Sequence, residues 1–276
     1  MLPRQRTSDV TVVITCFNYG QFLNDAVRSA LEQEDGPPRI VVVDDGSTEQ
    51  GTLEALERLP DGVELIRQQR AGVSAARNAG LGRVATTYAL VLDADDRLRP
   101  NALTTLREPL EKDSSLGFTY GRMHFFGNWQ GELRFPPYDP YALLYRHTIG
   151  LSALMRREVV ESTGGFDPAF DQFEDWEFWV NALAHGWRGL QIDAVTVDYR
   201  RHAAAKQGAD RKRYRKMFRA LKRKHAALYE KRDQLRAESR LGPGGRLLYR
   251  TYWGPRPLPA GLEALVYGRL WGVRES

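Results

Sequence analysis

Two groups of aspartates follow short apolar runs in the first hundred residues. The pair Asp44–Asp45 comes directly after Ile40–Val43, and Asp93-Ala-Asp-Asp96 comes directly after Tyr88–Leu92. Carboxylates that gather in one place repel one another unless a cation or hydrogen-bond donors lie among them. A divalent metal held by one or two carboxylates and by substrate phosphates is the usual arrangement for Mg²⁺, and Mn²⁺ accepts the same oxygen ligands. The sequence therefore predicts a site for a metal and a phosphorylated ligand.

The elements expected around these aspartates alternate between strands and helices. Strands are expected at Val10–Thr15, Ile40–Val43, Val63–Ile66 and Tyr88–Leu92, and helices at Phe22–Gln33, from a cap at Ser47 or Thr48 to about Leu59, and at Gly72–Ala85. Such strand–helix–strand units form a parallel sheet with helices on both faces. Because ligands bind beyond the carboxyl ends of parallel strands, both aspartate groups would lie at the ligand-binding edge. Either group alone could be a solvated turn, but their shared edge favours a site.

Several other kinds of site and segment are excluded by what the sequence lacks. The first expected strand is followed by Cys16-Phe-Asn-Tyr-Gly20 rather than by G-x-G-x-x-G, and no GxxxxGK[ST] occurs, so NAD-type and P-loop chemistry are not expected. The single cysteine, Cys16, excludes an intramolecular disulfide and a zinc site built from cysteines. The first ten residues lack the apolar core of a secretory signal, and no long apolar run predicts a membrane-spanning helix.

Six short motifs follow one another along the chain. They are Val12-Val-Ile-Thr-Cys-Phe-Asn18, Val43-Asp-Asp-Gly-Ser-Thr48, Ala76-Arg-Asn-Ala-Gly80, Leu92-Asp-Ala-Asp-Asp96, Gly164-Gly-Phe-Asp167 and Glu174-Asp-Trp176. In this order they resemble the family 2 glycosyltransferases, which are inverting, nucleotide-sugar-dependent enzymes with the GT-A fold. The resemblance covers roughly residues 9–202. It implies an α/β fold in which a Rossmann-like, mostly parallel sheet is flanked by helices.

The resemblance and a change of composition near residue 200 divide the chain. We expect a GT-A catalytic domain over residues 1–205, with a donor half over about 9–117 and an acceptor half over about 118–205. A basic helical and aromatic extension would follow over residues 206–276.

The resemblance implies roles for residues beside the first two strands. Thr15, Phe17, Asn18 and Asp45 match positions that hold the nucleobase. Asp45 would accept the ring N–H of a pyrimidine in a charge-assisted hydrogen bond. Asp44 would orient the turn.

The resemblance also implies how the diphosphate is held. Arg77 lies where a cation can face the diphosphate or the sugar. Asp93, Ala94 and Asp95 match the DxD motif, with Asp93 toward the ribose, Asp95 on the metal and Asp96 in support through a water. A divalent metal, Mn²⁺ or Mg²⁺, would bridge both phosphates and stabilise the charge that develops on the departing nucleoside diphosphate.

The pair Glu174–Asp175 opens the helix expected over Asp175–His185. In the family, the second residue of this pair is the general base, so Asp175 would deprotonate an acceptor hydroxyl while its oxygen attacks the anomeric carbon. Glu174 would support it. A carboxylate at a helix N-terminus has a lowered pKa and stays ionised at neutral pH. The alternative is an acidic first turn that only favours the helix.

His202 matches a late histidine that completes the metal site or contacts the diphosphate in related enzymes. Imidazole suits Mn²⁺ better than Mg²⁺. A solvated histidine in a basic loop is the alternative. Arg200, Arg201 and Lys206 could close over the diphosphate as a flexible lid. The spacing of the other four histidines marks no site; they are His124, His147, His185 and His225.

The positive charge is concentrated after the expected catalytic domain. Residues 200–250 hold 18 Lys or Arg against four acidic residues, a balance of +14, which leaves −9 for the rest of a chain whose net charge is +5. A long basic helical stretch is expected over 206–240, with an apolar stripe at Tyr214, Met217, Phe218, Leu221 and Leu228. Such a helix suits an anionic membrane surface. Packing on the catalytic domain and a homodimer interface are the alternatives.

Together these features predict an inverting, metal-dependent glycosyltransferase. Because the Q-x-x-R-W signature of processive synthases is absent, we expect transfer of one sugar from a nucleotide-diphosphate sugar, with a UDP-sugar as the first choice. The acceptor would be a saccharide or a lipid-linked hydroxyl in cell-surface polysaccharide or glycolipid assembly, in the cytoplasm or at the cytoplasmic face of the membrane. One alternative is a nucleic-acid-binding protein, which the acidic turns disfavour. The other is a non-catalytic, membrane-associated relative.

Overall fold

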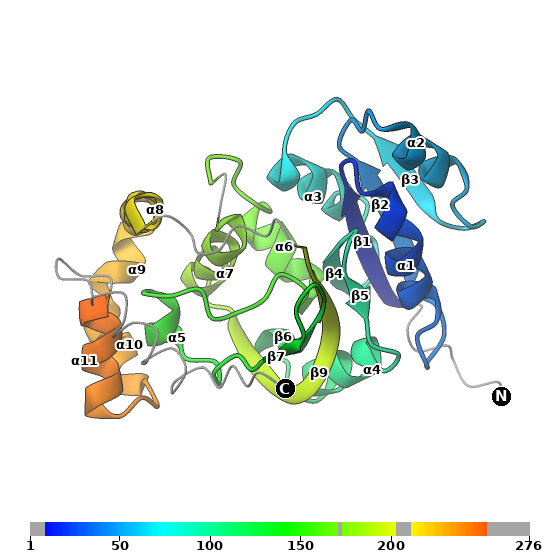
Figure 1. Cartoon of the computed structure of the whole chain (residues 1–276). Coiled ribbons are helices and arrows are strands. Elements are labelled where there is room, and N and C mark those ends of the chain that lie inside the picture. Colours follow the sequence, from blue (N-terminus) through cyan, green and yellow to red (C-terminus); the bar gives the residue numbers. More distant parts are fainter. Residues whose placement is uncertain (1–8, 171–172, 203–210, 253–276) are drawn as a thin grey trace.

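The computed structural model describes residues 9–170, 173–202 and 211–252. In this part of the chain the strands form one nine-stranded sheet, in the order β3-β2-β1-β4-β8-β6-β9-β5, with β7 paired to β6 (Figure 1). The strands are β1 (Val10–Cys16), β2 (Arg39–Asp44), β3 (Glu64–Arg67), β4 (Tyr88–Asp93), β5 (Arg97–Leu98), β6 (Leu116–Gly127), β7 (Gly131–Leu133), β8 (Leu154–Arg156) and β9 (Arg188–Arg201). The four strands expected in the first hundred residues are confirmed as β1 to β4.

Helices cover both faces of this sheet. They are α1 (Gly20–Leu31), α2 (Gln50–Glu57), α3 (Val73–Leu81), α4 (Ala102–Lys112), α5 (Pro140–Leu143), α6 (Arg157–Thr163), α7 (Glu174–Ala184), α8 (Arg211–Lys224), α9 (Ala226–Glu230), α10 (Arg232–Glu238) and α11 (Pro243–Tyr252). Alternate residues of the central strands face opposite sides, so that Val12 and Ile14 pack with α1, α2 and α4, whereas Val13 packs with α3, α6 and α7. Burial on both faces explains why these strands are continuous apolar runs.

The parallel strands bring the first aspartates to one edge, as the sequence predicts. β1 pairs in parallel with both β2 and β4, and its Thr15 lies opposite Val43 on one side and Asp93 on the other. The next residue, Cys16, lies opposite Asp44. The second half of the sheet is mixed: β8 runs antiparallel to β4 and β6, and β9 runs parallel to β6. The sheet therefore places both aspartate groups at the carboxyl ends of neighbouring strands.

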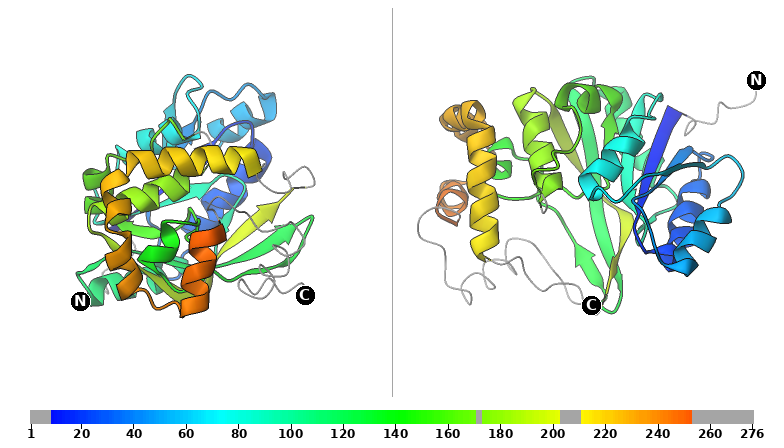
Figure 2. Two further views of the ribbon diagram at one scale, coloured as in Figure 1. Left: turned by 90° about the vertical axis from the view of Figure 1, so that its left-hand side faces the viewer. Right: turned by 90° about the horizontal axis from the view of Figure 1, so that it is seen from above.

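The basic stretch is not one helix. The expected helix over 206–240 is replaced by α8, α9 and α10, with breaks at His225 and Lys231, and residues 206–210 lie outside the described part. α8 lies alongside α7 (Figure 2) and buries apolar side chains there, with Met217 and Leu221 in the same hydrophobic cluster as Trp176. Packing on the rest of the protein therefore buries Met217, Leu221 and Leu228 of the apolar stripe, whereas the side chain of Tyr214 lies outside the described part.

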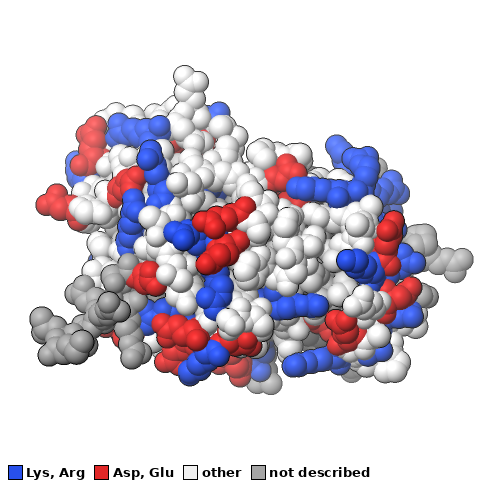
Figure 3. All heavy atoms as spheres, turned by 180° about the vertical axis from the view of Figure 1, so that it is seen from behind, with Lys and Arg blue, Asp and Glu red and all other residues white. Residues whose placement is uncertain are grey.

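The outer side of α8 keeps its charge. Its exposed cations are Arg215, Lys216, Arg219, Lys222 and Arg223, and Lys and Arg side chains gather at this end of the molecule when it is seen from behind (Figure 3). None of the helices within the described ranges is long and apolar enough to cross a bilayer. The division at residue 205 stays a prediction, since the extension and the acceptor half share one hydrophobic cluster.

Candidate functional site

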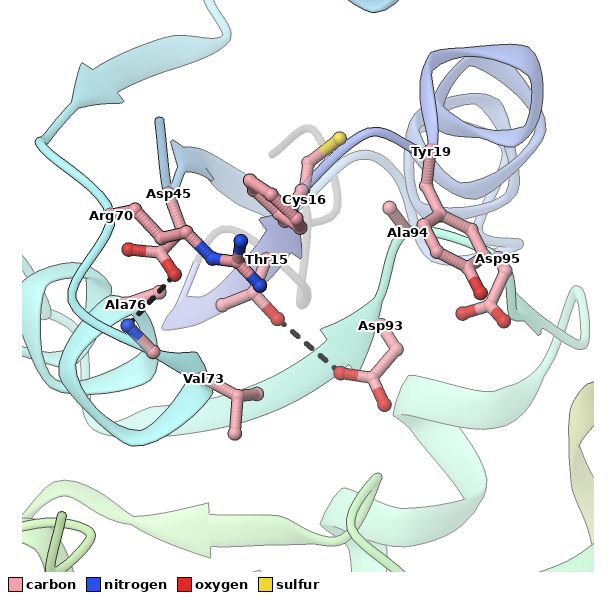
Figure 4. A pocket seen from close by; sticks show the side chains of 12 residues that line it. Thr15, Cys16, Tyr19, Asp45, Arg70, Val73, Ala76, Asp93, Ala94 and Asp95 are labelled. Carbon is pink, nitrogen blue, oxygen red and sulfur yellow. Dashed lines mark hydrogen bonds between the residues drawn. The ribbon is translucent and has the colours of Figure 1, made fainter. Parts of the chain in front are cut away.

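A cavity of about 400 Å³ opens at the carboxyl ends of β1, β2 and β4 (Figure 4). Six of the predicted donor residues line it: Thr15, Phe17, Asp45, Asp93, Ala94 and Asp95. The rest of the lining comes from residues that the sequence did not single out, namely Cys16, Tyr19, Arg70, Gly72, Val73 and Ala76. The remaining two predicted donor residues, Asn18 and Arg77, are not part of the wall.

Asp45 holds the loop on one side of the cavity. Its Oδ1 accepts hydrogen bonds from Gln68 Nε2 (2.7 Å) and from the Ala71 amide (2.8 Å), and its Oδ2 accepts from the Gly72 amide (2.9 Å). The carboxylate therefore fixes the segment between β3 and α3. A ring N–H of a bound base would have to share one of these oxygens.

Asn18 has a local role that its position in the motif did not predict. Its Oδ1 accepts from the amides of Thr48 (2.8 Å) and Glu49 (3.1 Å) just before α2. We expected Ser47 or Thr48 to cap this helix, but neither side chain does so. Asp44 Oδ1 accepts from the Ser47 amide at 2.9 Å, so Asp44 orients the turn. Asn18 and Asp44 thus hold the turn between β2 and α2.

Arg70 is a cavity residue that the sequence reasoning missed. Its guanidinium carbon lies 4.0 Å from the centre of the Phe17 ring, which is cation–π geometry. Gly46 makes this approach possible, because a Cβ there would lie 2.7 Å from the Arg70 amide nitrogen. The available signal was a cation in the loop that follows the third strand at the same sheet edge. Arg70 supplies positive charge beside the aromatic wall.

The acidic cluster lies at the opposite wall of the cavity. Carboxylate oxygens of Asp93, Asp95 and Asp96 all lie within 4.8 Å of one another. Burial, reinforced by the charge of Asp93, raises the pKa of Asp95, and the same causes raise the pKa of Asp96 well above its usual value. Asp96 Oδ1 also accepts from the Arg200 amide at 2.9 Å. The cluster is thus short of positive charge, and hard oxygen ligands of this kind fit Mn²⁺ or Mg²⁺.

His202 lies beside this cluster. Its Nε2 is 2.8 Å from Asp95 Oδ2, although the two residues are 107 positions apart. The ring also packs against Tyr19 and Phe22, with ring centres 5.6 and 5.3 Å away. The two residues predicted as metal ligands therefore meet, with the imidazole held in place by aromatic neighbours.

The two arginines before His202 belong to β9 rather than to a loop. Arg200 donates from Nε to the Asp95 carbonyl (2.9 Å), and its guanidinium lies 4.3 Å from the Phe22 ring centre. Arg201 lies over the Phe125 ring at 5.6 Å. The expected flexible lid is therefore wrong for Arg200 and Arg201, because the sheet holds both, and Lys206 lies outside the described residues.

Arg77 is buried between two carboxylates. Its Nη1 lies 2.6 Å from Glu174 Oε1, and its Nη2 lies 3.1 Å from Asp93 Oδ1. Burial disfavours its charge, but Asp93 and Glu174 outweigh burial and raise the pKa of Arg77. The cation therefore neutralises carboxylates at the end of β4 and at the start of α7 instead of lining the cavity, where we expected it to face the diphosphate.

Asp175 lies at the start of α7, as predicted. Its Oδ1 accepts from the Trp176 amide (2.8 Å), and its Oδ2 lies 3.2 Å from His147 Nε2. Burial alone would raise its pKa, but His147 and Arg77 lower it below the usual value. Glu174 behaves in the opposite way, because burial and the Asp175 charge raise its pKa. Asp175 is therefore the more readily ionised member of the pair, and its carboxylate can accept a proton.

His147 is the second residue that the sequence reasoning missed. It lies in the segment between α5 and β8, 28 positions before Asp175, and no local motif connects the two. Of the other histidines, His225 has its Nε2 2.8 Å from Oε1 of the buried Glu177, where α8 ends beside α7.

The aromatic side chains of α7 belong to the core. Trp176, Phe178 and Trp179 are all buried there, and core packing is a common use of large aromatic residues.

Comparison with known sequences finds glycosyltransferases. The family model described as Glycosyl transferase family 2 matches residues 11–164. The chain is 31% identical to the succinoglycan biosynthesis protein ExoO of Rhizobium meliloti, over 66% of this chain and 58% of that protein. It is 27% identical to the putative teichuronic acid biosynthesis glycosyltransferase TuaG of Bacillus subtilis, over 69% of this chain and 78% of that protein. The chain spans just over half the length of ExoO and of an uncharacterized Nostoc glycosyltransferase that it also matches.

Solved structures share the fold. S. aureus TarS in complex with UDP has a TM-score of 0.63 at 16% identity, over 88% of this chain and 70% of that chain. The mannosyltransferase PcManGT of Pyrobaculum calidifontis, in complex with GDP-Man and Mn²⁺, has a TM-score of 0.59 at 20% identity, over 95% of this chain and 80% of that chain. These likenesses confirm the expected GT-A fold.

Proposed function

Because the chain belongs to the family 2 glycosyltransferases, we propose that it moves one sugar from a nucleotide-diphosphate sugar to an acceptor hydroxyl. The observation that carries this proposal is the contact between Asp95 and His202, which lie 2.8 Å apart beside the cavity. The buried Arg77 pairs with Asp93 at the cavity and with Glu174, the neighbour of Asp175. The proposed metal ligands and the proposed base would thus lie on opposite sides of Arg77.

The cavity would take the nucleotide of the donor. Its volume of about 400 Å³ is within the usual range of roughly 300–1,000 Å³ for small-ligand sites. The base would lie between Phe17 and Asp45, and Arg70 would face a phosphate. Solved relatives of the same fold contain UDP, UDP-GlcNAc or GDP-Man, which supports a nucleoside diphosphate sugar. A UDP-sugar is our first choice.

Asp95 and His202 would hold a divalent metal, with Asp93 and Asp96 beside it. When bound, the ion supplies positive charge to the diphosphate oxygens and to the leaving group as charge develops there. The mixed carboxylate and imidazole ligands favour Mn²⁺ over Mg²⁺, and Mn²⁺ accompanies GDP-Man in PcManGT. Asp96 keeps the cluster attached to β9 through the Arg200 amide.

Asp175 would act as the general base. It takes the proton of the acceptor hydroxyl while that oxygen forms a bond to the anomeric carbon. The bond between this carbon and the diphosphate oxygen breaks at the same time, and the nucleoside diphosphate departs with the electron pair. One such displacement inverts the anomeric centre. Arg77 and Glu174 fix the distance between this base and the donor edge.

The acceptor is proposed from the relatives. Two of them are named for succinoglycan and teichuronic acid biosynthesis, which supports a role in cell-surface polysaccharide or glycolipid assembly. The acceptor would be a saccharide or a lipid-linked hydroxyl. Without the Q-x-x-R-W signature, one sugar would be transferred in each encounter.

The outer face of α8 would contact the cytoplasmic face of the membrane. Its exposed cations, Arg215, Lys216, Arg219, Lys222 and Arg223, form one basic surface. Because the apolar side of α8 is buried in the protein, the contact would be electrostatic and would weaken with salt.

The proposed transfer is tested with the full chain, Mn²⁺ and a panel of UDP-, GDP- and dTDP-sugars. One nucleotide should raise the melting temperature, and its sugar donor should be slowly hydrolysed. Asp175→Asn should lower turnover by roughly 10²- to 10⁴-fold, the usual contribution of a general base, while nucleotide binding stays the same. Glu161→Gln, on the exposed side of α6, is the control. If calorimetry finds no binding of UDP, GDP or dTDP with Mn²⁺, the donor site is wrong.

A further inference from the structure

The segment between α5 and β8 brings a histidine to the proposed base. We infer that His147 is a positioning residue, whose imidazolium holds the Asp175 carboxylate ionised and oriented toward the acceptor hydroxyl. This role rests on the proposed function of Asp175 as the base. His147 itself does not touch the reacting atoms.

The geometry of the pair is that of a partly buried ion pair. His147 Nε2 lies 3.2 Å from Asp175 Oδ2, and the two side chains are 26% and 20% exposed. Within the described residues this nitrogen forms no well-angled hydrogen bond, so the contact is ionic rather than a linear hydrogen bond. The other oxygen of Asp175 accepts from the Trp176 amide. Both oxygens are thus held, and each keeps a lone pair for an incoming hydroxyl.

The chain on either side of His147 is fixed to the start of α7 and to the extension. Trp176 Nε1 donates to the Leu143 carbonyl at 2.7 Å, so the residue after Asp175 binds the end of α5. The Tyr229 hydroxyl, from α9, donates to the Leu144 carbonyl. Ile149, two residues after His147, is fully buried. The imidazole therefore approaches Asp175 from a rigid support.

Charges around the pair favour the imidazolium and the carboxylate. Burial would lower the pKa of His147, but Asp175, the Ile149 carbonyl and Glu174 outweigh it and raise that pKa. Asp175 faces His147 and Arg77 as cations and Glu174 as an anion, and its pKa is lowered. Asp175 on one side of the ring and the Ile149 backbone on the other thus both favour the doubly protonated form of His147.

The charge of His147 has a chemical consequence for Asp175. Without it, the carboxylate would be buried beside the like charge of Glu174, with Arg77 as its main remaining cation. A carboxylate in that setting takes up a proton at higher pH. Loss of His147 should therefore extend the pH range in which the base is protonated and inactive.

Histidine titration by NMR tests the pair without an acceptor. The full chain labelled with ¹³C-histidine gives signals from five histidines, and His147→Gln identifies the signal of residue 147. It should titrate above the ordinary value of about 6.5 and move down by about one pH unit in Asp175→Asn, as loss of an opposite charge predicts. Asp198→Asn is the matched control, because Asp198 lies 2.9 Å from His124 rather than beside His147, and this change should leave the His147 titration as it is in the wild type. An unchanged titration of His147 in Asp175→Asn would overturn the inference.

The pH profile of donor hydrolysis gives the second readout. We expect the acid limb of His147→Gln to move up by about one pH unit, with the affinity for UDP and Mn²⁺ unchanged. An acid limb identical to that of the wild type overturns the positioning role. If Asp175→Asn keeps its activity, the proposed base fails instead, and the NMR result tells these two failures apart.

Discussion

Arg77 and Glu174 form an ion pair with 2.6 Å between Nη1 and Oε1, and the Arg77 side chain is only 5% exposed. The same guanidinium reaches Asp93 at 3.1 Å. Arg77 comes from α3, and Glu174 opens the helix that carries Asp175. One buried cation thus connects the donor edge of the sheet to the proposed base.

Removing this cation should destabilise the fold. In Arg77→Met the carboxylates of Asp93 and Glu174 lose their shared partner, and breaking a buried pair in this way costs about 3–5 kcal/mol. Urea unfolding measures the loss. Arg83→Met is the control, because Arg83 is 58% exposed in its pair with Glu64, and exposed pairs contribute about 0–1 kcal/mol. Similar losses in both variants would contradict the bridging role.

The acidic cluster and His202 should govern the response to metal. We expect Mn²⁺ to raise the affinity for UDP, and Asp95→Ala to remove this increase. His202→Ala should weaken the metal-dependent binding by about tenfold or more, as loss of a metal-site partner does. Calorimetry at several Mn²⁺ concentrations measures both effects. Asp61→Ala, an exposed position outside the cavity, should bind like the wild type, and a wild-type response from Asp95→Ala would argue against the metal site.

Arg70 should contribute to nucleotide affinity. Its charge faces the cavity beside Phe17, and a hydrogen bond from a cation to a phosphate contributes about 1.5–3 kcal/mol. Arg70→Ala should therefore weaken UDP binding by about tenfold or more. Arg67→Ala removes a nearby exposed cation that does not line the cavity, and it should leave the dissociation constant unchanged. Equal weakening in both would indicate a general charge effect.

The pair of His147 and Asp175 should contribute to stability over a limited pH range. The pKa of His147 is raised, so its contribution is complete below the unfolded value of about 6.5 and is lost as the pH rises through the folded value. The pKa of Asp175 is lowered, so its contribution disappears as the pH falls below about 4. The stability difference between wild type and His147→Gln should therefore be largest between about pH 4 and 6.5.

The control for His147→Gln is the same substitution at a histidine that contacts a carbonyl instead of a carboxylate. His185 contacts the Asn181 carbonyl at 2.9 Å, so His185→Gln removes a histidine without removing an ion pair with a carboxylate. Urea unfolding at pH 5.5 and 8.5 measures the difference in stability between the wild type and each variant. A His147→Gln difference that is the same at both pH values would contradict the ion pair.

The basic face of α8 should bind anionic lipid by charge alone. Vesicles with phosphatidylserine should float the full chain, and the triple change of Arg215, Arg219 and Arg223 to glutamate should abolish flotation. Raising the salt to about 0.5 M, where screening is strong, should do the same. A matched triple change of Arg28, Arg58 and Arg83, all exposed far from α8, should still float. Equal binding to neutral vesicles refutes the electrostatic contact, and binding of nucleic acid alone favours that alternative.

The sequence alone determined the parallel half of the sheet and the place of its aspartates. Continuous apolar runs, separated by helical stretches, leave few arrangements other than crossovers that bury both faces of each strand. The strand ends then share one edge, so the sequence pattern is sufficient to place Thr15, Asp44 and Asp93 together. The order of the six motifs also identified the family.

Only the tertiary structure decided what lies against these elements. A sequence shows that α8 has an apolar side, but whether α7, a membrane or a second copy covers that side depends on surfaces far away in the chain. Asn18 likewise matches a donor motif, yet it binds the turn before α2. The partnership of His147 with Asp175 joins two segments that share no motif. The charge state of such a pair follows from burial and neighbouring charges, which exist only once the chain has folded.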